Sequence, residues 1–348
     1  MRPHAYAAHE AIAVTRRFLI VGAGAIGAIT GVHLARAGHD VQFAETNAAH
    51  VEAVRDGGLR LSGALEATIK PSISTPEEID GSYDSILLAV KARHTVDAVP
   101  LLKRVLAPDG CVVSLQNGLE EYKLSDALGA DRVIGAYLTF GGFYVEPGHV
   151  KYGGAGSFKL GELDGRMTDR LSDLAQTLSV QQPVQATDNI FGFLWAKMAL
   201  GAVYFGTAIT DLDVPDVYDD PERRRILALL CGETVSVAEK LGIDMETTDG
   251  FDPKAFNLQS GTEAAQQVSW QAQRRYWSGH DNKRTGIWRD LAIHKRETEM
   301  DGLIDEVIRL AGKNGVPVPH LQRLSEAVHA IERGERKMSP DALLQLGR

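Results

Sequence analysis

Residues 18–27 leave few folds open to this 348-residue chain, because an apolar run there leads directly into glycines spaced G-x-G-x-x-G. The run is long enough for one buried strand, and residues 28–37 continue in a helical pattern. A strand, a glycine turn and a helix in this order are typical of dinucleotide-binding proteins. In that setting Gly22 allows the tight turn, Gly24 lets a pyrophosphate approach the backbone, and Gly27 lets helix and strand pack closely.

The residues around the glycines strengthen this prediction. Ala25 and Ile26 lie between the last two glycines, just before the expected helix, and are further candidates for cofactor binding. The phosphates would lie on the free N–H groups and the positive dipole end of that helix. Glu45 ends the next strand, about 20 residues beyond the glycines, where a carboxylate can accept hydrogen bonds from an adenosine ribose. The alternative interpretation is a turn that binds no nucleotide, followed by a solvated glutamate.

Composition limits the kinds of partner. The formal net charge of -9 argues against a nucleic-acid partner, because nucleic acids bind basic surfaces. No apolar run approaches the length of a membrane span, so no membrane partner is expected. Cys111 and Cys231 lie far apart in apolar surroundings, which is typical of buried thiols in a reducing cytoplasm. We expect a cytoplasmic protein that acts on a small molecule and needs no metal. The sequence does not decide whether it forms a homodimer.

The order of the expected elements divides the chain into two domains. Residues 1–16 are interpreted as a short leader or a mis-called start. Strands alternate with helices over residues 17–188, which predicts an α/β domain of the Rossmann type with a doubly wound parallel sheet. Within it, residues 137–163 show an antiparallel pattern. Residues 189–348 are expected to form an all-α domain, with helices over residues 191–208, 221–241, 253–259, 264–277, 287–314 and 321–333.

Two polar residues follow buried strands of the predicted sheet. Lys91 comes at the end of the strand expected over residues 82–90, and Asn117 follows the strand expected over residues 111–115. Ligands bind at the carboxyl edge of such sheets, so both side chains are candidates for a cofactor site. The alternatives are a solvated lysine at a strand end and an ordinary turn residue before a glycine.

From about Arg17 onward the chain resembles the ketopantoate reductase family. The resemblance rests on separated motifs in the right order: GAGAIG (22–27), VK (90–91), QNG (116–118), EPG (146–148), LGE (160–162), WAK (195–197), KRETEMD (295–301) and GVPVP (315–319). It implies a Rossmann domain joined to a helical domain, with the active site in the cleft between them. It also implies hydride transfer from a nicotinamide to the carbonyl of a 2-oxo acid.

The resemblance assigns roles to four residues of this chain. Lys197 would be the general acid on the substrate oxygen, and Glu299 would interact with the lysine and the substrate. Asn117 would lie beside the nicotinamide and the substrate, and Lys91 near the cofactor's ribose. A general acid works best with a pKa near the working pH, so burial should lower the lysine pKa from about 10.4 while Glu299 opposes that shift. The alternatives are a solvated helix lysine and one member of the charged run at residues 295–299.

Three positions depart from the family pattern around the substrate. Two asparagines that follow the lysine in the family are replaced here by Gly201 and Phe205. The serine that binds a carboxylate most closely corresponds to Gly286, with Thr285 beside it. These changes should enlarge the substrate pocket and alter its chemistry.

Two arginines near that lost serine could compensate for it. Arg284 and Arg289 lie on either side of residues 285–286. A guanidinium binds a carboxylate through two parallel hydrogen bonds, so either residue could hold the acid group of the substrate.

The cofactor site departs from the family as well, because Glu45-Thr46 stands where the family commonly carries an arginine for the extra phosphate of NADPH. A carboxylate repels that phosphate but accepts hydrogen bonds from the ribose hydroxyls of NAD. We therefore expect NAD, with NADP as the alternative. The competing functions are a true NADPH-dependent 2-dehydropantoate 2-reductase and a catalytically silent dinucleotide-binding sensor.

Overall fold

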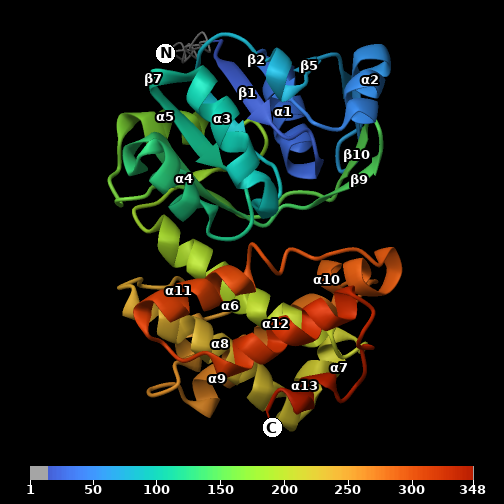
Figure 1. Ribbon diagram of the computed structural model, residues 1–348, viewed down its shortest axis with the longest axis vertical. Helices are drawn as coiled ribbons and strands as arrows, with labels where there is room; N and C mark the ends of the chain where they lie inside the picture. Colours follow the sequence, from blue (N-terminus) through green and yellow to red (C-terminus); the bar gives the residue numbers. More distant parts are fainter. Residues whose placement is uncertain (1–14, 348) are drawn as a thin grey trace, which may run out of the picture.

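The computed structural model describes residues 15–347. The predicted leader, residues 1–16, therefore lies almost entirely outside the described residues. Figure 1 shows a sheet flanked by helices, stacked on a body built of helices. The change from one architecture to the other comes at α6 (Ile190–Ala208), directly after the predicted boundary at residue 188.

An eight-stranded, mostly parallel sheet forms the first body, as predicted. Its strands lie in the order β12-β11-β8-β7-β6-β1-β2-β5, and only β11 pairs antiparallel to its neighbour β8 among the strands with described partners. The order reverses between β1 and β6, which is where ligands bind in doubly wound sheets. The bounds are β1 (Arg17–Val21), β2 (Asp40–Ala44), β5 (Ser72–Ser74), β6 (Tyr83–Leu88), β7 (Leu106–Ser114), β8 (Val133–Leu138), β11 (Phe158–Glu162) and β12 (Gln185–Ala186).

Helices cover both faces of this sheet, which explains why its strands are apolar on both sides. In β1, Phe18 and Ile20 belong to one buried core, while Leu19 and Val21 belong to another on the opposite face. The flanking helices are α1 (Ala25–Arg36), α2 (Ala48–Gly57), α3 (Thr95–Val105), α4 (Glu120–Leu128) and α5 (Asp169–Leu178).

A second, four-stranded sheet lies beside α1 and α2, in the order β4-β3-β10-β9 (Figure 1). Its strands are β3 (Leu59–Gly63), β4 (Ala67–Ile69), β9 (Gly142–Glu146) and β10 (His149–Tyr152). The β9–β10 pair is antiparallel, in line with the pattern expected over residues 137–163. The edge strand β9 passes close to the start of α1, because a Cβ at Gly142 would lie 3.4 Å from Ala25 Cβ.

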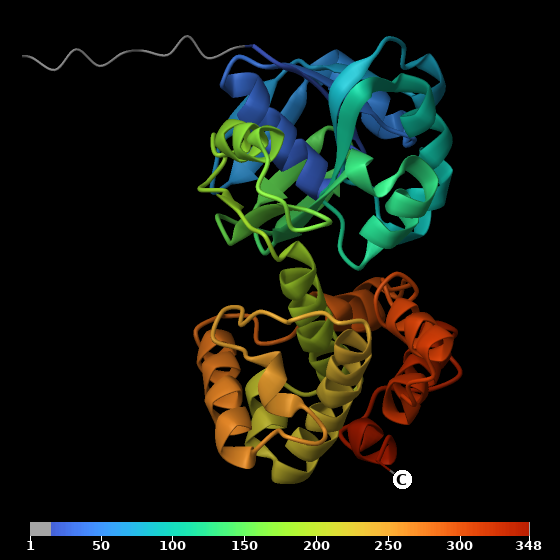
Figure 2. The same ribbon diagram turned by 90° about the vertical axis from the view of Figure 1, so that its left-hand side faces the viewer.

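The second body is helical, as predicted, and α6 runs down into it from the sheet (Figure 2). Its other helices are α7 (Val214–Asp219), α8 (Pro221–Lys240), α9 (Glu263–Ser278), α10 (Gly286–Arg289), α11 (Ile304–Asn314), α12 (Pro319–Glu332) and α13 (Ala342–Gln345). Cys231 lies in this core and Cys111 in the core of the sheet, and both are free and buried, as expected.

The prediction of one helix over residues 287–314 is wrong. The structure has α10, a π-helical turn η5 (Asp290–His294) and α11, with a non-helical segment at residues 295–303. Lys295 ends η5 in a left-handed conformation, with φ of 47°. Gly302 in this segment packs against the first body, since a Cβ there would lie 2.2 Å from Ala92 Cβ. Tertiary contacts therefore override the helical sequence pattern.

Two smaller predictions are also corrected. The helix expected over residues 253–259 is a single 3-10 turn, η4 (Pro253–Phe256), because Asn257 Oδ1 accepts from Gln259 N and Ser260 N and turns the chain. The strand expected over residues 111–115 begins earlier, at Leu106. Residues Pro108–Gly110 do not precede the strand but form a bulge within β7.

The expectation about membrane-spanning length is wrong for α6. Its 19 residues are long and apolar enough to cross a membrane by length and composition alone. However, 67% of its most apolar window is buried, and α6 packs against α8 in the helical core. A buried core helix meets the same criterion, so this helix is weak evidence for a membrane.

Candidate active site

The glycine turn has the geometry that a dinucleotide requires. Gly22 follows β1 with φ of 97°, and a Cβ there would lie 3.0 Å from the backbone of Ala89 and Val90. A Cβ at Gly27 would lie 2.0 Å from Gly22 O, so only glycine fits. Gly24 precedes the first helical residue of α1, and a Cβ there would meet nothing within 4 Å.

The open space at Gly24 lies before the first turn of α1, where the backbone N–H groups of Ala25 and Ile26 begin the helix. Early helical N–H groups have no carbonyl partner within the helix, and the helix dipole adds positive charge there. A dinucleotide phosphate fits this turn.

Glu45 lies beside the glycine turn and is held by two backbone groups. Its Oε2 accepts from Ala23 N at 2.8 Å, and its Oε1 accepts from Asn47 N at 2.8 Å. Each oxygen keeps a second lone pair, so the carboxylate can still accept from two hydroxyls. This arrangement fits an adenosine ribose.

His50, on α2, supports the same turn and was missed by sequence reasoning. Its Nδ1 accepts from Gly148 N at 3.0 Å, so the neutral ring carries its proton on Nε2, which donates to Ala23 O at 3.1 Å. Burial lowers the pKa of His50, and nearby Glu45 opposes this. The histidine thus joins the β9–β10 turn to the glycine turn. No motif marks this role in the sequence.

Lys91 lies between β6 and the 3-10 turn η2 (Ala92–His94), on the far side of the switch point from Glu45. Its side chain is exposed and makes no hydrogen bond or ion pair to residues 15–347. It is therefore free to reach a ligand, although its predicted contact with the cofactor ribose stays a prediction.

The residues proposed for catalysis come together from three separate segments. Lys197 Nζ, on α6, donates to Asn117 Oδ1 and to the backbone oxygen of Leu138, both at 2.8 Å. Asn117 Nδ2 donates to Glu299 Oε2 at 3.2 Å. The amide thus presents its oxygen to the ammonium and its nitrogen to the carboxylate. One proton of the Lys197 ammonium is left for a further acceptor.

The surroundings of Lys197 favour proton transfer near neutral pH. Burial lowers the pKa of Lys197 to about 8, while the charge of Glu299 opposes the shift, as does Glu121 in its ionised form. Nζ also lies over the Tyr137 ring, 5.9 Å from its centre.

Glu121, in the first turn of α4, is a second residue that sequence reasoning missed. It is buried, and neither carboxylate oxygen has a hydrogen-bond partner within the described chain. Burial raises the pKa of Glu121 to about 8, so this carboxyl is largely protonated at neutral pH.

The two positions that depart from the family asparagines differ in their surroundings. Gly201 lies one turn beyond Lys197 on α6, and a Cβ there would meet nothing within 4 Å. Phe205 is instead completely buried in the core of the helical body. Open space beside the lysine therefore lies at Gly201, whereas Phe205 fills the protein core, and the enlargement of a substrate pocket stays a prediction.

The three residues proposed for carboxylate binding near α10 also differ. The Thr285 hydroxyl accepts from Trp288 N at 3.1 Å and so begins α10. Arg284 is held by Asp211 and Asp213, at 2.6 and 3.0 Å. Arg289 has no ion pair or side-chain hydrogen bond with residues 15–347, and its guanidinium lies 5.4 Å from the centre of the Phe143 ring on β9.

No group of three or more His, Cys, Asp or Glu side chains within the described residues could hold a metal ion.

Comparisons with known proteins agree with this fold. Residues 18–165 match the family model described as ketopantoate reductase PanE/ApbA, and residues 189–332 match its C-terminal model. The 2-dehydropantoate 2-reductases of Halobacterium salinarum and Archaeoglobus fulgidus are each 28% identical. These alignments cover 91% and 92% of this chain and 99% of each relative.

Solved structures share the whole fold. A PanE/ApbA family ketopantoate reductase from Ralstonia eutropha is 28% identical with a TM-score of 0.76, covering 92% of this chain and 99% of the other. D-mandelate dehydrogenase in complex with NADH is 22% identical with a TM-score of 0.78, covering 92% of this chain and all of the other (100%). The chain belongs to the ketopantoate reductase family and is an NAD(P)-dependent oxidoreductase acting on a CH–OH/carbonyl pair.

Proposed function

We propose that this protein is an NAD-dependent oxidoreductase that interconverts a 2-oxo acid, or a similar carbonyl compound, and its alcohol. The observation that carries the proposal is the hydrogen-bonded chain from Lys197 through Asn117 to Glu299. A protein that only binds a dinucleotide has no need for a partly buried lysine held in this way. This argument disfavours the alternative of a catalytically silent sensor.

Lys197 acts as the general acid in this mechanism. When bound, the nicotinamide would supply the hydride that reaches the carbonyl carbon. Negative charge then grows on the substrate oxygen, and Lys197 neutralises it by giving up the proton that Asn117 and Leu138 leave free. In the reverse direction the neutral amine of Lys197 accepts the proton from the alcohol.

Asn117 and Glu299 keep the lysine in place. The amide of Asn117 orients the ammonium, and Glu299 orients the amide through Nδ2. The carboxylate also keeps more of Lys197 in the charged form, because an opposite charge nearby raises its pKa.

Glu45 supports NAD as the cofactor. Its carboxylate is fixed by Ala23 N and Asn47 N at the place where a ribose would bind, so it would lie near the extra phosphate of NADP. Two negative groups at short range repel each other, whereas the hydroxyls of NAD donate to the carboxylate.

Arg289 is the residue we propose for the substrate carboxylate, since Arg284 is already paired with two aspartates. Open space at Gly201 leaves room for a substrate group that an asparagine would otherwise contact. A substrate other than ketopantoate is therefore favoured. The homologues named 2-dehydropantoate 2-reductase support the competing function, a true ketopantoate reductase.

The deciding experiment is a screen of 2-oxo acids, 2-hydroxy acids and other alcohols, with NAD(H) and NADP(H) tested in parallel. Turnover is measured from the absorbance of the reduced cofactor. Turnover of a 2-oxo acid with NADH, and little with ketopantoate, supports the proposal. Efficient turnover of ketopantoate with NADPH supports the competing reductase. Absence of turnover across the panel, with NADH still bound, supports the sensor.

A cytoplasmic location also belongs to this proposal, and the two free buried cysteines support it.

A further inference from the structure

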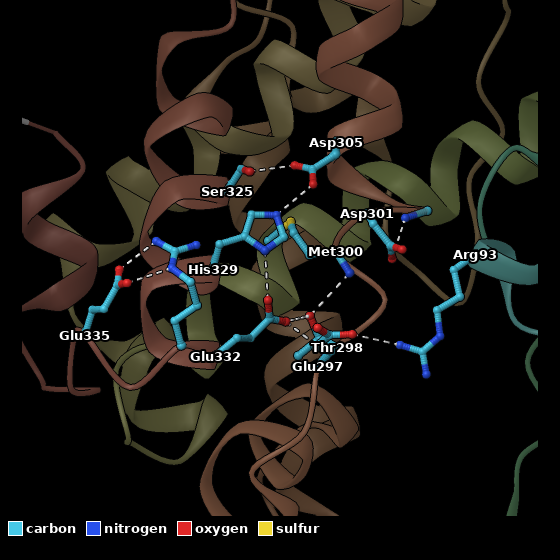
Figure 3. A network of polar contacts seen from close by, with 12 residues as sticks. Arg93, Glu297, Thr298, Met300, Asp301, Asp305, Ser325, His329, Glu332 and Glu335 are labelled. Atoms are coloured by element: carbon cyan, nitrogen blue, oxygen red, sulfur yellow. Dashed lines mark hydrogen bonds and ion pairs between the residues drawn. The ribbon is translucent and has the colours of Figure 1, made fainter.

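Glu299 lies on the non-helical segment 295–303, so something other than helix geometry must fix it. Thr298, its neighbour, is buried and donates to Glu332 Oε1 twice, from its backbone N at 2.8 Å and from Oγ1 at 2.6 Å (Figure 3). Glu332 is at the end of α12. The segment that carries Glu299 is thus fastened to α12 by one carboxylate.

That carboxylate is itself held by His329, one turn earlier on α12. His329 Nδ1 bonds Glu332 Oε2 at 2.8 Å, and its Nε2 bonds Asp305 Oδ2, on α11, also at 2.8 Å (Figure 3). Asp305 Oδ1 accepts in addition from Ser325 Oγ at 2.5 Å. We call Asp305, His329 and Glu332 the His329 network.

The ring in this network carries a positive charge. Ionised carboxylate oxygens only accept hydrogen bonds, so both ring nitrogens must donate, and only imidazolium has two N–H groups. Burial alone would lower the pKa of His329, but the hydrogen bonds to Asp305 and Glu332 raise it overall. The next charged side chain, Arg333, is paired with Glu335 at 2.7 Å. A neutral ring would leave one nitrogen lone pair facing a carboxylate.

The other side of segment 295–303 contacts the sheet domain. Gly302 packs on Ala92, and a Cβ at Gly118 would lie 2.5 Å from Gly302 O. Glu297 pairs with Arg93 at 3.2 Å, although its side chain is 78% exposed and the pair contributes little. The segment is therefore held between the loops after β6 and β7 on one side and the His329 network on the other.

We propose that His329 and Glu332 are positioning residues for the reaction: they fix Thr298 and thereby hold the Glu299 carboxylate against Asn117. This inference rests on the proposed function, because it takes Glu299 to act on Lys197 through Asn117. It goes beyond the family motif, whose T-E dipeptide includes neither Asp305, His329 nor Glu332.

The first test measures the segment itself. Amide hydrogen exchange at residues 297–303 should become faster in His329→Gln and in Thr298→Val, since each removes a hydrogen bond to Glu332. Thr298→Ser keeps the hydroxyl and should restore protection. The matched control is Arg333→Gln, which breaks the exposed ion pair with Glu335 just after α12 and keeps the backbone bond from Arg333 N to His329 O. Unchanged exchange in His329→Gln overturns the proposal.

The second test measures catalysis and its coupling to Glu299, with a 2-oxo acid that the screen identifies. His329→Gln should lower kcat/KM roughly 10- to 100-fold, the scale of a small misplacement of a catalytic group, with unchanged NADH affinity. Combined with Glu299→Gln, it should cause little further loss, because both changes act on one interaction. Arg333→Gln should leave kcat/KM unchanged. Full additivity of the two losses overturns the positioning role.

The two proposals can fail separately. If Glu299→Gln keeps normal kcat/KM, the role of Glu299 in the proposed function is wrong, whatever the exchange data show. If Glu299→Gln is impaired but His329→Gln exchanges and turns over normally, the proposed function stands and the positioning role is wrong.

Discussion

The backbone N–H of Ala23 donates to the Glu45 carboxylate at 2.8 Å, so the residue that we expect to select the cofactor also holds the glycine turn. We predict that NADH binds more tightly than NADPH, as measured by fluorescence titration. Glu45→Gln removes the charge but keeps an oxygen for one of the two N–H donors. It should therefore reduce the difference in affinity between NADH and NADPH. Glu45→Ala should in addition weaken both, because Ala23 N loses its acceptor. Tighter NADPH binding by the unaltered protein contradicts this prediction.

Lys197→Ala should lower the rate by roughly 10²–10⁴, the usual contribution of general acid catalysis, and leave NADH affinity unchanged. Lys197→Arg should rescue little, because a guanidinium stays protonated and has a different shape. Kinetics and fluorescence titration of each variant, with an unfolding curve, provide the test. Near-normal turnover of Lys197→Ala shows that the lysine is not the general acid.

The same lysine predicts opposite pH profiles for the two directions. With its pKa lowered to about 8 by burial, Lys197 is charged below that pH and neutral above it. Reduction needs the charged form, so kcat for reduction should fall as the pH rises through about 8. Oxidation needs the neutral amine and should rise over the same interval. If kcat for reduction and kcat for oxidation change in the same direction with pH, the assignment of this pKa to Lys197 as general acid and base is wrong.

Arg289→Ala should raise KM for a 2-oxo acid roughly 10- to 100-fold, the scale of a hydrogen bond to a charged group. Arg289→Lys should recover part of the loss, since it keeps the charge without the fork. Arg284→Gln is the matched control: it breaks two ion pairs within the helical body and should lower stability with little change in KM. If only Arg284→Gln changes KM, Arg284 and not Arg289 binds the substrate carboxylate.

Ketopantoate should be a poor substrate, with kcat/KM below about 10⁵ M⁻¹s⁻¹, because Gly201 supplies no amide to bind it. Gly201→Asn should raise this value, since open space receives the new side chain. Gly201→Ala separates the amide from the helix effect: alanine stabilises a helix by about 1 kcal/mol over glycine but offers no hydrogen bond. Equal gains in both variants remove the argument for a lost amide contact.

His50 predicts a loss of stability in acid. Its pKa is lowered in the folded protein, so between that value and about 6.5 the unfolded chain binds more protons, and stability falls as the pH falls through this range. His50→Gln can still accept from Gly148 N and donate to Ala23 O, and should reduce this pH dependence while retaining NADH binding. His50→Ala should weaken NADH binding. Unfolding curves from pH 5 to 8 check the first point.

The sheet and the glycine turn could be predicted from sequence because local signals agree there. The apolar run at residues 18–21 favours a buried strand, the three glycines favour a tight turn, and Glu45 falls where a dinucleotide-binding unit carries an acid. All three predict the same strand–turn–helix unit. Only the family resemblance assigned Lys197, Asn117 and Glu299 to one site, because long stretches of chain separate them. It did not predict that Lys197 bonds Asn117, 80 positions away, and that Asn117 in turn bonds Glu299.

What the sequence did not reveal depends on long-range contacts. The helical pattern over residues 287–314 is real, yet the bonds from Thr298 to Glu332 and the contact of Gly302 with Ala92 favour an irregular path. His50, Glu121 and His329 carry no local signal, because their significance arises only when distant segments meet. Arg284 and Arg289 look alike in sequence, and only Asp211 and Asp213 distinguish them.

The two hydrogen bonds that Lys197 makes to Asn117 and Leu138 have a consequence for the catalytic cycle. An ammonium has three protons and an amine two, so the lysine can lose one proton and still donate to both partners. Its nitrogen therefore need not move or rotate between the two protonation states. In the proposed mechanism, the lone pair created by proton loss points where the proton was, towards the product oxygen, and the site is ready for the reverse reaction without rearrangement.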